Sequence, residues 1–171
     1  MRAEARRRGA ACALRAAGRL LIAFWLLVLP AWADDGTPQA LATTPLLVET
    51  AQGVHRLTVE VARTPAQRAI GLMYRTTMPP DHGMLFDLGV PRVVSMWMKN
   101  TFISLDMLFI QSDGRIANIV ADTVPESLAP VRSRGRVLGV LELNAGTAAA
   151  LGIRPGDLIR HGMFDNMPHA D

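Results

Sequence analysis

The residues best suited to chemistry lie close together in one stretch of the sequence, VVSMWMKNTFISLDMLFI at 93–110. Trp97, Lys99, Asn100 and Asp106 interrupt a run that is otherwise mostly apolar. An aromatic surface beside a few convergent polar groups is a common way to build a ligand pocket. The stretch therefore raises a choice between a binding site and a methionine-rich folding element.

Asp106 is the polar residue of this stretch that most needs an explanation. Successive side chains of a strand point to opposite faces, so Asp106 shares a face with Leu108 and Ile110. A carboxylate buried there without a donor would be strongly destabilising. The donors nearest in sequence are Lys99 and the backbone at 100–101. A structural interpretation is that Asp106 fixes the turn at 100–104.

A functional interpretation competes with the structural one. In it, polar groups converge at the mouth of a pocket whose candidate ligand-binding residues are Trp97, Lys99, Asn100, Asp106 and Glu142. A hydrolase-like enzyme that uses Asp106 or Glu142 with Lys99 is an alternative, and it requires two of these groups within hydrogen-bond reach in a cleft.

Methionines suggest a second alternative, a Cu(I) site. Six of the nine methionines fall between Met73 and Met107, and thioethers are soft ligands that suit Cu(I). The candidate ligands are His82, Met84, Met96 and Met98. Methionine is also a common filler of apolar cores, so the default expectation is that these side chains are core and that the protein has no metal or cofactor.

Most catalytic machinery is missing from the sequence. The single cysteine, Cys12, lies in a predicted export segment, which leaves no thiol nucleophile and no disulfide. No phosphate-binding glycine loop, zinc-spaced histidine pair or nucleophile elbow is present. A Ser–His–Asp triad remains an alternative, because its three residues need to be close in space and not in sequence. We expect a binding module rather than an enzyme.

The first 33 residues have the pattern of a secretory signal peptide. Several arginines precede the apolar run LLIAFWLLVL at 20–29, and Ala31 and Ala33 supply the small residues of a cleavage site. A membrane span needs about 20 apolar residues, and this run has half that number. We expect cleavage after Ala33, by either general or twin-arginine export, and a periplasmic or secreted protein with no membrane span.

Export also changes the charge balance. Six of the 18 Lys and Arg residues and one of the 15 Asp and Glu residues lie in the export segment, so the mature chain would carry 12 against 14, a net charge of −2. A nucleic-acid-binding protein is expected to carry a basic stripe. The partner we expect is an unidentified small molecule or envelope protein, and not a nucleic acid.

Apolar alternation and turn residues predict eight strands, at 46–51, 55–62, 83–88, 92–99, 105–111, 115–121, 136–143 and 158–164. A helix is predicted at 65–75, because Thr64 and Gln67 form a capping box around Pro65. A second is predicted at 144–152 with Asn144 as its cap. Asp157 is expected to accept from the backbone of the RPGD turn.

Strands that do not alternate with helices argue against a doubly wound parallel sheet. The predicted fold class is α+β, a mostly antiparallel, barrel-like sheet with one or two short helices packed on it. The predicted organisation is a signal peptide at 1–33, a flexible leader at 34–45, one domain at 46–165 and a loose tail at 166–171.

Several blocks of the sequence resemble the DUF192 (UPF0127) family of bacterial and archaeal proteins. They include WMKNT with the following LD, LELNAG at 141–146 and the Gly-Asp pair at 156–157. The resemblance covers about 57–163. It departs at 127–139, where an aromatic-bearing loop is expected and none is found. The resemblance implies a compact, often exported single domain, and it supplies no biochemical activity.

Overall fold

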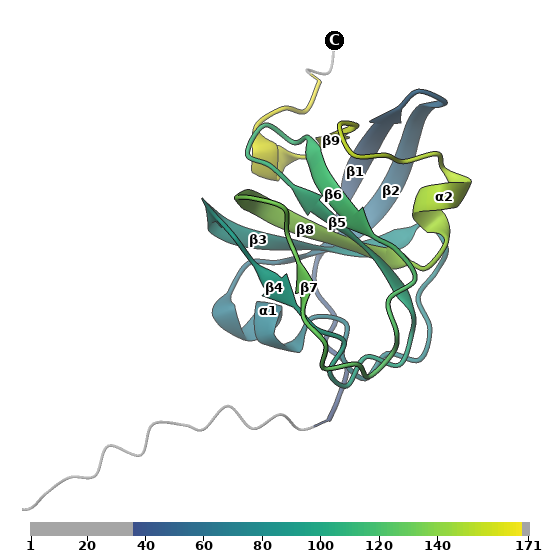
Figure 1. Cartoon of the computed structure of the whole chain (residues 1–171), viewed down its shortest axis with the longest axis vertical. Coiled ribbons are helices and arrows are strands. Elements are labelled where there is room, and N and C mark those ends of the chain that lie inside the picture. The colour runs from purple at the N-terminus through teal and green to yellow at the C-terminus, as the bar shows by residue number, and fades with distance from the viewer. Residues whose placement is uncertain (1–35, 169–171) are drawn as a thin grey trace, which may run out of the picture. The chain divides into compact units, whose positions relative to one another are not determined.

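The computed structural model describes residues 36–168. Two sheets form its framework (Figure 1): one of seven strands in the order β6-β5-β8-β3-β2-β1-β9, and a small one that pairs β4 with β7. The strands are β1 (Thr43–Thr50), β2 (Gly53–Ala62), β3 (His82–Arg92), β4 (Ser95–Met96), β5 (Leu105–Ile110), β6 (Ile116–Val120), β7 (Val131–Arg132), β8 (Val137–Asn144) and β9 (Leu158–Arg160). The helices are α1 (Pro65–Ile70), α2 (Thr147–Ala150) and the 3₁₀ helix η1 (Gly162–Phe164).

The large sheet is mixed rather than purely antiparallel. Strands β2 and β3 pair in parallel, whereas every other neighbouring pair in this sheet is antiparallel. The parallel pair arises because α1 connects the two strands, and a strand can return in the same direction only through a crossover connection. The prediction of a curled sheet with two short helices is confirmed, and the parallel pair is the correction to it.

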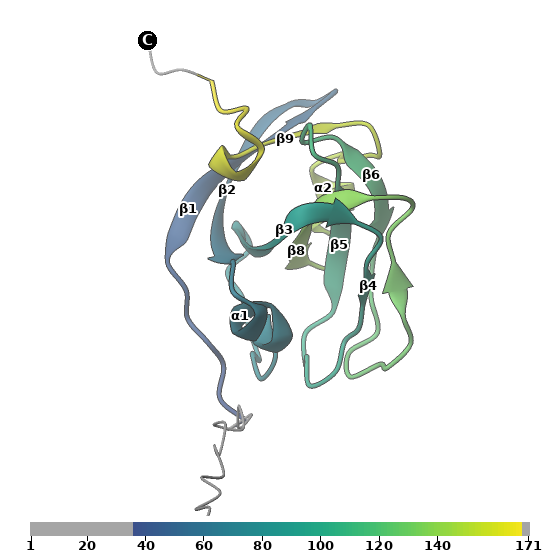
Figure 2. The ribbon, with the colours of Figure 1, turned by 90° about the vertical axis from the view of Figure 1, so that its left-hand side faces the viewer.

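The sheet curls into a half-barrel. Figure 2 shows its strands wrapping around the interior, with β9 and β6 approaching each other at one end. There an antiparallel bridge joins Arg115 to Leu158, and the N–H of Ile159 donates to the carbonyl of Gly114 over 2.8 Å. Irregular register in β3 between Asp87 and Arg92, and in β6 at Ala117 opposite Phe109 and Ile110, supplies bulges that favour this curvature.

Two apolar clusters occupy opposite faces of the large sheet, as the alternation in β5 requires. Leu108 and Ile110 belong to an aliphatic cluster, and Leu105, Met107 and Phe109 belong to a cluster that contains methionine and phenylalanine. All of β5 is buried. We refer to these groups as the aliphatic cluster and the methionine cluster.

Helix α1 begins as predicted and ends earlier. Thr64 and Gln67 form the expected capping box. The helix stops at Ile70 because Gly71 takes a positive φ of 53° and packs against a ring: a Cβ there would lie 3.0 Å from an atom of Phe86. The chain then turns, which places Leu72 in the methionine cluster.

Helix α2 has a different start from the one predicted. Asn144 is the last residue of β8, and its side-chain amide donates to the carbonyls of Met78 and Pro79. The N-cap position is Gly146, which makes no side-chain cap. Asn144 therefore ties a loop to the sheet, because a side chain at a strand end can reach the loop that covers it.

The predicted strands at 92–99 and 158–164 are longer than the strands found there, β4 and β9. Strand β7 forms at a place where no strand was predicted. Strands β4 and β7 pair only with each other, over two residues each. They are short because neither has a second neighbouring strand that would extend the pairing. The Asp157 carboxylate accepts from the Arg154 N–H over 2.8 Å, as predicted for the turn.

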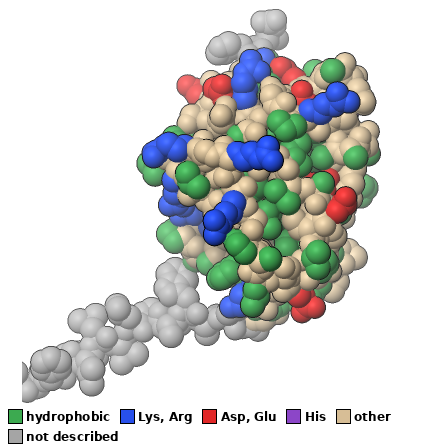
Figure 3. Space-filling model, viewed as in Figure 1, with side chains coloured by type: hydrophobic (Ala, Val, Ile, Leu, Met, Phe, Trp, Pro, Cys, Tyr) green, Lys and Arg blue, Asp and Glu red, His purple; other side chains and the backbone are tan. Residues whose placement is uncertain are grey.

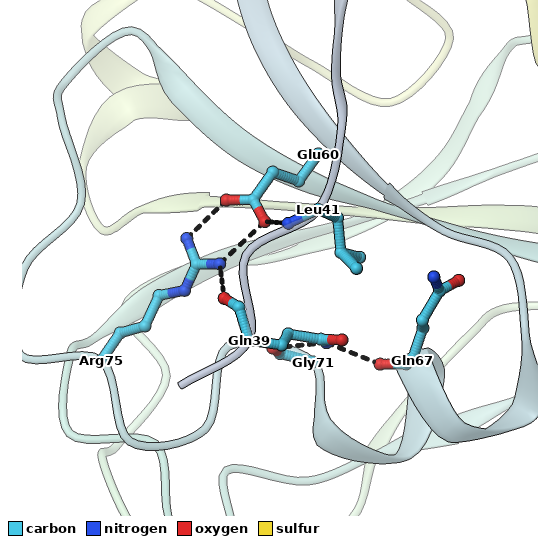
Figure 4. Close-up of polar contacts among 6 residues, drawn as sticks. All are labelled: Gln39, Leu41, Glu60, Gln67, Gly71 and Arg75. Carbon is cyan, nitrogen blue, oxygen red and sulfur yellow. Dashed lines mark hydrogen bonds and ion pairs between the residues drawn. The ribbon is translucent and has the colours of Figure 1, made fainter. Parts of the chain in front are cut away.

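Part of the predicted leader is held against the domain (Figure 4). The Gln39 side chain donates to the carbonyls of Gln67 and Gly71, and the Leu41 N–H donates to Glu60 over 2.6 Å. Arg75 completes the group, with bonds of 2.7 and 2.9 Å to the Glu60 carboxylate. Strand β1 also begins at Thr43, three residues before the predicted domain start.

Glu60→Gln should make this attachment insensitive to acid. Burial opposes the charge of Glu60, but the hydrogen bonds from Arg75 and Leu41 outweigh it and hold the pKa of this carboxyl below 4.5. The ion pair therefore stabilises the fold above pH 4.5, and that stability is lost as pH falls through the folded pKa. The variant should unfold about 1–2 kcal/mol more easily at pH 7.

Urea unfolding from pH 7 to pH 3 measures the effect, and the wild type and the variant should converge as the pH falls below 4.5. Glu49→Gln is the matched control, because Glu49 pairs with Arg160 at a more exposed position and should change stability by less than about 1 kcal/mol. Equal losses in the two variants would contradict the role given to Glu60.

The C-terminal segment is held as far as Asn166, whose side chain donates to the carbonyl of Ile159 and accepts from the N–H of His161. The predicted signal peptide lies outside the described residues. Within 36–168, no helix is both long enough and apolar enough to cross a bilayer.

Candidate functional site

The carboxylate of Asp106 is enclosed in the domain and bonded to backbone. Its Oδ1 accepts from the Asp122 N–H over 3.0 Å, and its Oδ2 accepts from the Ala148 N–H over 2.8 Å. Ala148 lies in the first turn of α2, so Asp106 satisfies a helix N–H that has no intrahelical partner. The expectation that Lys99 or the backbone at 100–101 supplies the donors is wrong, because the strand directs the carboxylate toward a different loop and toward α2.

Glu142 lies on the other face of the sheet. In the register of β8, Glu142 pairs with Met84 of β3 and Met107 of β5, whereas Asp106 pairs with Leu143. Glu142 is only 4% exposed. Burial away from water raises the pKa of its carboxyl to about 8, so this side chain is mostly a neutral acid at pH 7.

The two carboxyl groups therefore cannot act together. Adjacent strand positions point to opposite faces, and Leu143, the cross-strand partner of Asp106, directly follows Glu142 in β8. Lys99 is exposed on a loop. The hydrolase-like arrangement of Asp106 or Glu142 with Lys99 requires a shared cleft, and these three side chains do not line one.

Three loops meet at one end of the domain, the lower end in Figures 1 and 2. They are residues 71–81, 97–104 and 121–130, and we call them together the loop end. The Tyr74 N–H donates to the Asn100 carbonyl over 2.8 Å, and the Met98 N–H donates to the Ser127 carbonyl over 2.9 Å. Each loop is thus hydrogen-bonded to a neighbour.

Backbone strain concentrates in these loops. Five described non-glycine residues have positive φ, and four of them, Tyr74, Asn100, Asp122 and Glu126, belong to the loop end. Such a conformation is unfavourable for most residues and is kept where the surroundings enforce it. Here the enforcement is visible: the Glu126 N–H donates to the Thr101 carbonyl, and the Asn100 amide donates to the Tyr74 hydroxyl over 2.6 Å.

The loop end also exposes large apolar side chains. Trp97 is 55% exposed and Phe102 is 46% exposed, while Val124 and Leu128 are each 68% exposed. The Lys99 ammonium lies 5.8 Å from the centre of the Trp97 ring. Figure 3 shows hydrophobic side chains, in green, on the lower part of the same face as Figure 1.

Three of the five predicted site residues thus belong to the loop end and two to the interior. Trp97 and Lys99 are exposed, Asn100 is half-buried against Tyr74, and Asp106 and Glu142 are buried. Sequence reasoning missed Phe102, Val124 and Leu128. A sequence signal that could have found them is their position close to residues that form loops, namely Pro125, Pro130 and Asn100. A large apolar side chain in a loop is not needed for the core, so it can be exposed.

The predicted copper ligands are not arranged as one open site. His82 donates to or accepts from its neighbour Asp81 over 2.8 Å, Met84 and Met98 are enclosed in the methionine cluster, and Met96 packs partly against it. Among residues 36–168, no group of three His, Cys, Asp or Glu residues could hold a metal ion.

Shallow grooves occur on the described surface, and one of about 360 Å³ lies between residues 38–40 and residues 74–77 of the loop end. A second of about 280 Å³ lies beside β4 and is lined by Arg68, Phe86, Leu88, Arg92, Val94, Ser95 and Met96. A third of about 550 Å³ lies between the β1–β2 hairpin and α2. Met96, a candidate copper ligand, lines the groove beside β4, and Pro80 and Asp81 of the loop end line the groove beside α2. None of the five candidate ligand-binding residues lines any of these grooves.

These features define a small half-barrel domain in which loops hydrogen-bonded to one another present apolar side chains, and the buried carboxyls lie on opposite faces of the sheet. The chain belongs to the DUF192 family, described as "Uncharacterized ACR, COG1430", whose sequence pattern matches residues 47–161. The resemblance in the sequence is thereby confirmed.

Two crystal structures are similar over most of the chain. One is of a protein from Sinorhizobium meliloti 1021, provisionally described as a transcription regulator; it is 52% identical with a TM-score of 0.71 and covers 74% of this chain and 99% of its own. The other is a protein of unknown function from Novosphingobium aromaticivorans DSM 12444, 42% identical with a TM-score of 0.69, covering 71% of this chain and 86% of its own. No curated protein matches the sequence.

Proposed function

We propose that this protein is a non-catalytic binding module of the cell envelope, and that it binds a protein partner through the loop end. The observation that carries the proposal is the exposure of Trp97 and Phe102 on loops that are fixed by hydrogen bonds to one another. Exposed apolar patches commonly mark interaction sites. Loops fixed before binding lose little conformational entropy when a partner docks.

The chemistry of the loop end limits which kinds of partner can bind there. Tryptophan is enriched among the residues that dominate binding energy at protein interfaces. Lys99 lies beside the Trp97 ring and is the cation nearest to it in sequence. The partner that fits this surface presents apolar side chains next to an acidic group. A small molecule fits less well, because an enclosed pocket is the usual site for one.

The cell envelope enters the proposal through the predicted signal peptide, whose basic segment, short apolar run and Ala-Trp-Ala ending are typical of export. No cysteine follows residue 12. The domain therefore has no disulfide to form, and its fold does not depend on whether that compartment is oxidising.

DNA binding is the competing function that the description of the Sinorhizobium protein raises. A DNA-binding surface needs basic residues to neutralise phosphates. The loop end carries two cations, Lys99 and Arg75, and Arg75 is paired with Glu60. It also carries the exposed acids Asp81, Asp122 and Glu126, and the mature chain would have a net charge of −2. Charge thus favours a protein partner over a nucleic acid.

Photo-crosslinking in the source cells tests the proposal. A benzophenone side chain at position 102 or 128 should give one discrete adduct with an envelope protein. Trp97→Ala or Lys99→Glu in the same chain should reduce that adduct at least about fivefold, because buried aromatic and charged anchors carry most interface energy. Trp97 is exposed, so its replacement should leave stability within about 0.5 kcal/mol.

Position 54 is the matched control, since Val54 is an exposed apolar residue on the β1–β2 hairpin, at the other end of the domain in Figure 1. Equal adducts from 54, 102 and 128, or none from any, would remove the proposal. Co-sedimentation with anionic phospholipid vesicles, accompanied by a blue shift of Trp97 emission, would instead assign the loop end to a membrane surface. Retardation of duplex DNA at physiological salt would favour the regulator function.

A further inference from the structure

The two apolar clusters differ in their content of sulfur. The buried members of the aliphatic cluster include no methionine, whereas those of the methionine cluster include Met78, Met84, Met98 and Met107. Methionine can fill irregular space, but this uneven placement collects soft thioether donors on one face of the sheet. That is the face on which Glu142 lies.

Glu142 stands between two of these thioethers. Its cross-strand partners are Met84 on one side and Met107 on the other. Side chains directly opposite each other in an antiparallel pair have Cβ atoms about 4.5–5.5 Å apart. The three side chains therefore leave the sheet in the same direction from one row, within reach of a common point above Glu142.

The carboxyl of Glu142 has no protein partner in the described part of the chain. No hydrogen bond or ion pair reaches it, and burial is what perturbs its titration. The next acid in the row, Glu60, pairs with Met84 in register and is already bonded to Arg75. Among residues 36–168, no side-chain oxygen or nitrogen is both fully enclosed and unpartnered, so each unbonded carboxyl oxygen of Glu142 keeps a small contact with solvent.

We propose that Glu142, Met84 and Met107 form a binding site for a soft monovalent cation, Cu(I) or Ag(I). Two thioethers select soft ions over Mg²⁺ and Ca²⁺, which prefer oxygen ligands. One carboxylate balances one positive charge, so the occupied site is neutral. A divalent ion would leave a net charge in an apolar cluster, which is unfavourable without further ligands.

Binding of the ion displaces a proton. At neutral pH the carboxyl carries a proton because burial raises its pKa to about 8. The protonated acid and M⁺ give the carboxylate–M⁺ pair and one H⁺, so the apparent affinity should rise up to about tenfold per pH unit below that pKa. The ionisable groups nearest in the strand register are Glu60, which pairs with Met84, and His82, two residues before Met84 in β3; Arg56 and Glu49 lie farther along the same face. Glu60 and His82 contact Arg75 and Asp81 respectively, and the remaining members of the methionine cluster are apolar.

Calorimetric titration of the mature protein with silver nitrate in chloride-free buffer tests the proposal. Two buffers of different protonation enthalpy count the protons released. The wild type should bind one equivalent tightly with nearly one proton released at pH 7, and ¹³C-methyl spectra should show shifts at Met84 and Met107. Glu142→Gln should abolish the proton release and weaken binding at least about tenfold.

Met84→Leu and Met107→Leu should each weaken binding at least about tenfold, and both are volume-conserving changes that a core tolerates. Met163→Leu, in a methionine that packs against the aliphatic cluster, is the matched control and should bind like the wild type. His82→Ala removes the half-buried histidine of this face as a background site. No tight equivalent, or equal binding in Met84→Leu, Met107→Leu and Met163→Leu, would overturn the proposal.

Discussion

Replacing Asp106 by asparagine should lower the free energy of unfolding by about 2–4 kcal/mol at pH 7. The carboxylate accepts from two backbone donors, the N–H groups of Asp122 and Ala148. An asparagine retains one acceptor oxygen and turns an NH₂ group toward the other donor. One buried N–H is then left without an acceptor, and the loss is large because Asp106 has no exposed surface to admit water.

Chemical denaturation monitored by Trp97 fluorescence and by circular dichroism measures this loss. Asp157→Asn is the matched control, since Asp157 also accepts a backbone N–H, that of Arg154, but in an exposed turn. It should cost less than about 1 kcal/mol. If Asp106→Asn were as stable as the control, the buried hydrogen bonds would not carry the stability assigned to them.

Because Asp106 variants should be destabilised, they are unsuitable for testing binding at the loop end. Asp106 is 0% exposed, so it cannot touch a partner or ligand in the folded domain. Loss of binding in an Asp106 variant would report damage to the loop at Asp122 and to α2. Trp97 and Lys99 variants are the suitable probes of the loop end because those side chains are exposed.

Glu142→Gln is expected to have the opposite effect and to stabilise the protein as pH rises. The unfolded carboxyl has its ordinary value near 4.5, while burial raises the folded pKa to about 8. Between these values the unfolded chain has released the proton and the folded chain retains it, so stability falls with increasing pH. The glutamine variant has no such proton, and it should gain on the order of 2–3 kcal/mol at pH 8–9.

Thermal unfolding of both proteins from pH 4 to pH 9 provides the measurement. The two should have similar stability near pH 4, where the carboxyl is protonated in both states, and should diverge above pH 4.5. Glu49→Gln again serves as a control, at a position that is partly open to solvent. A gap between Glu142→Gln and the wild type that does not change with pH would contradict a buried, mostly neutral Glu142.

Local patterns in the sequence were enough to predict much of the fold. The capping box at Thr64 and Gln67 formed as predicted, because its partners are three residues apart. The alternation of β5 correctly separated Leu105, Met107 and Phe109 from Leu108 and Ile110, because a strand fixes its two faces residue by residue. The family resemblance rested on contiguous blocks in the same way and is confirmed over residues 47–161.

The contacts of the candidate site could not be predicted in this way. The donors to Asp106 lie 16 and 42 residues away in the chain, whereas sequence reasoning looked to its neighbours. Asn144 likewise bonds to carbonyls 66 and 65 residues away and does not cap a helix. Hydrogen-bond partners between distant segments depend on how the sheet curls, and a one-dimensional pattern does not contain that geometry.

The sequence by itself determined the strand faces, the start of α1, the RPGD turn and the family, because each depends on neighbouring residues or on contiguous blocks. Only the tertiary structure decided that Asp106 and Glu142 are buried on opposite faces while Trp97 and Lys99 remain exposed at the loop end. The physical reason is the pairing of β5 with β8. Its register fixes which face each carboxyl occupies, and a register between strands is a property of the folded chain.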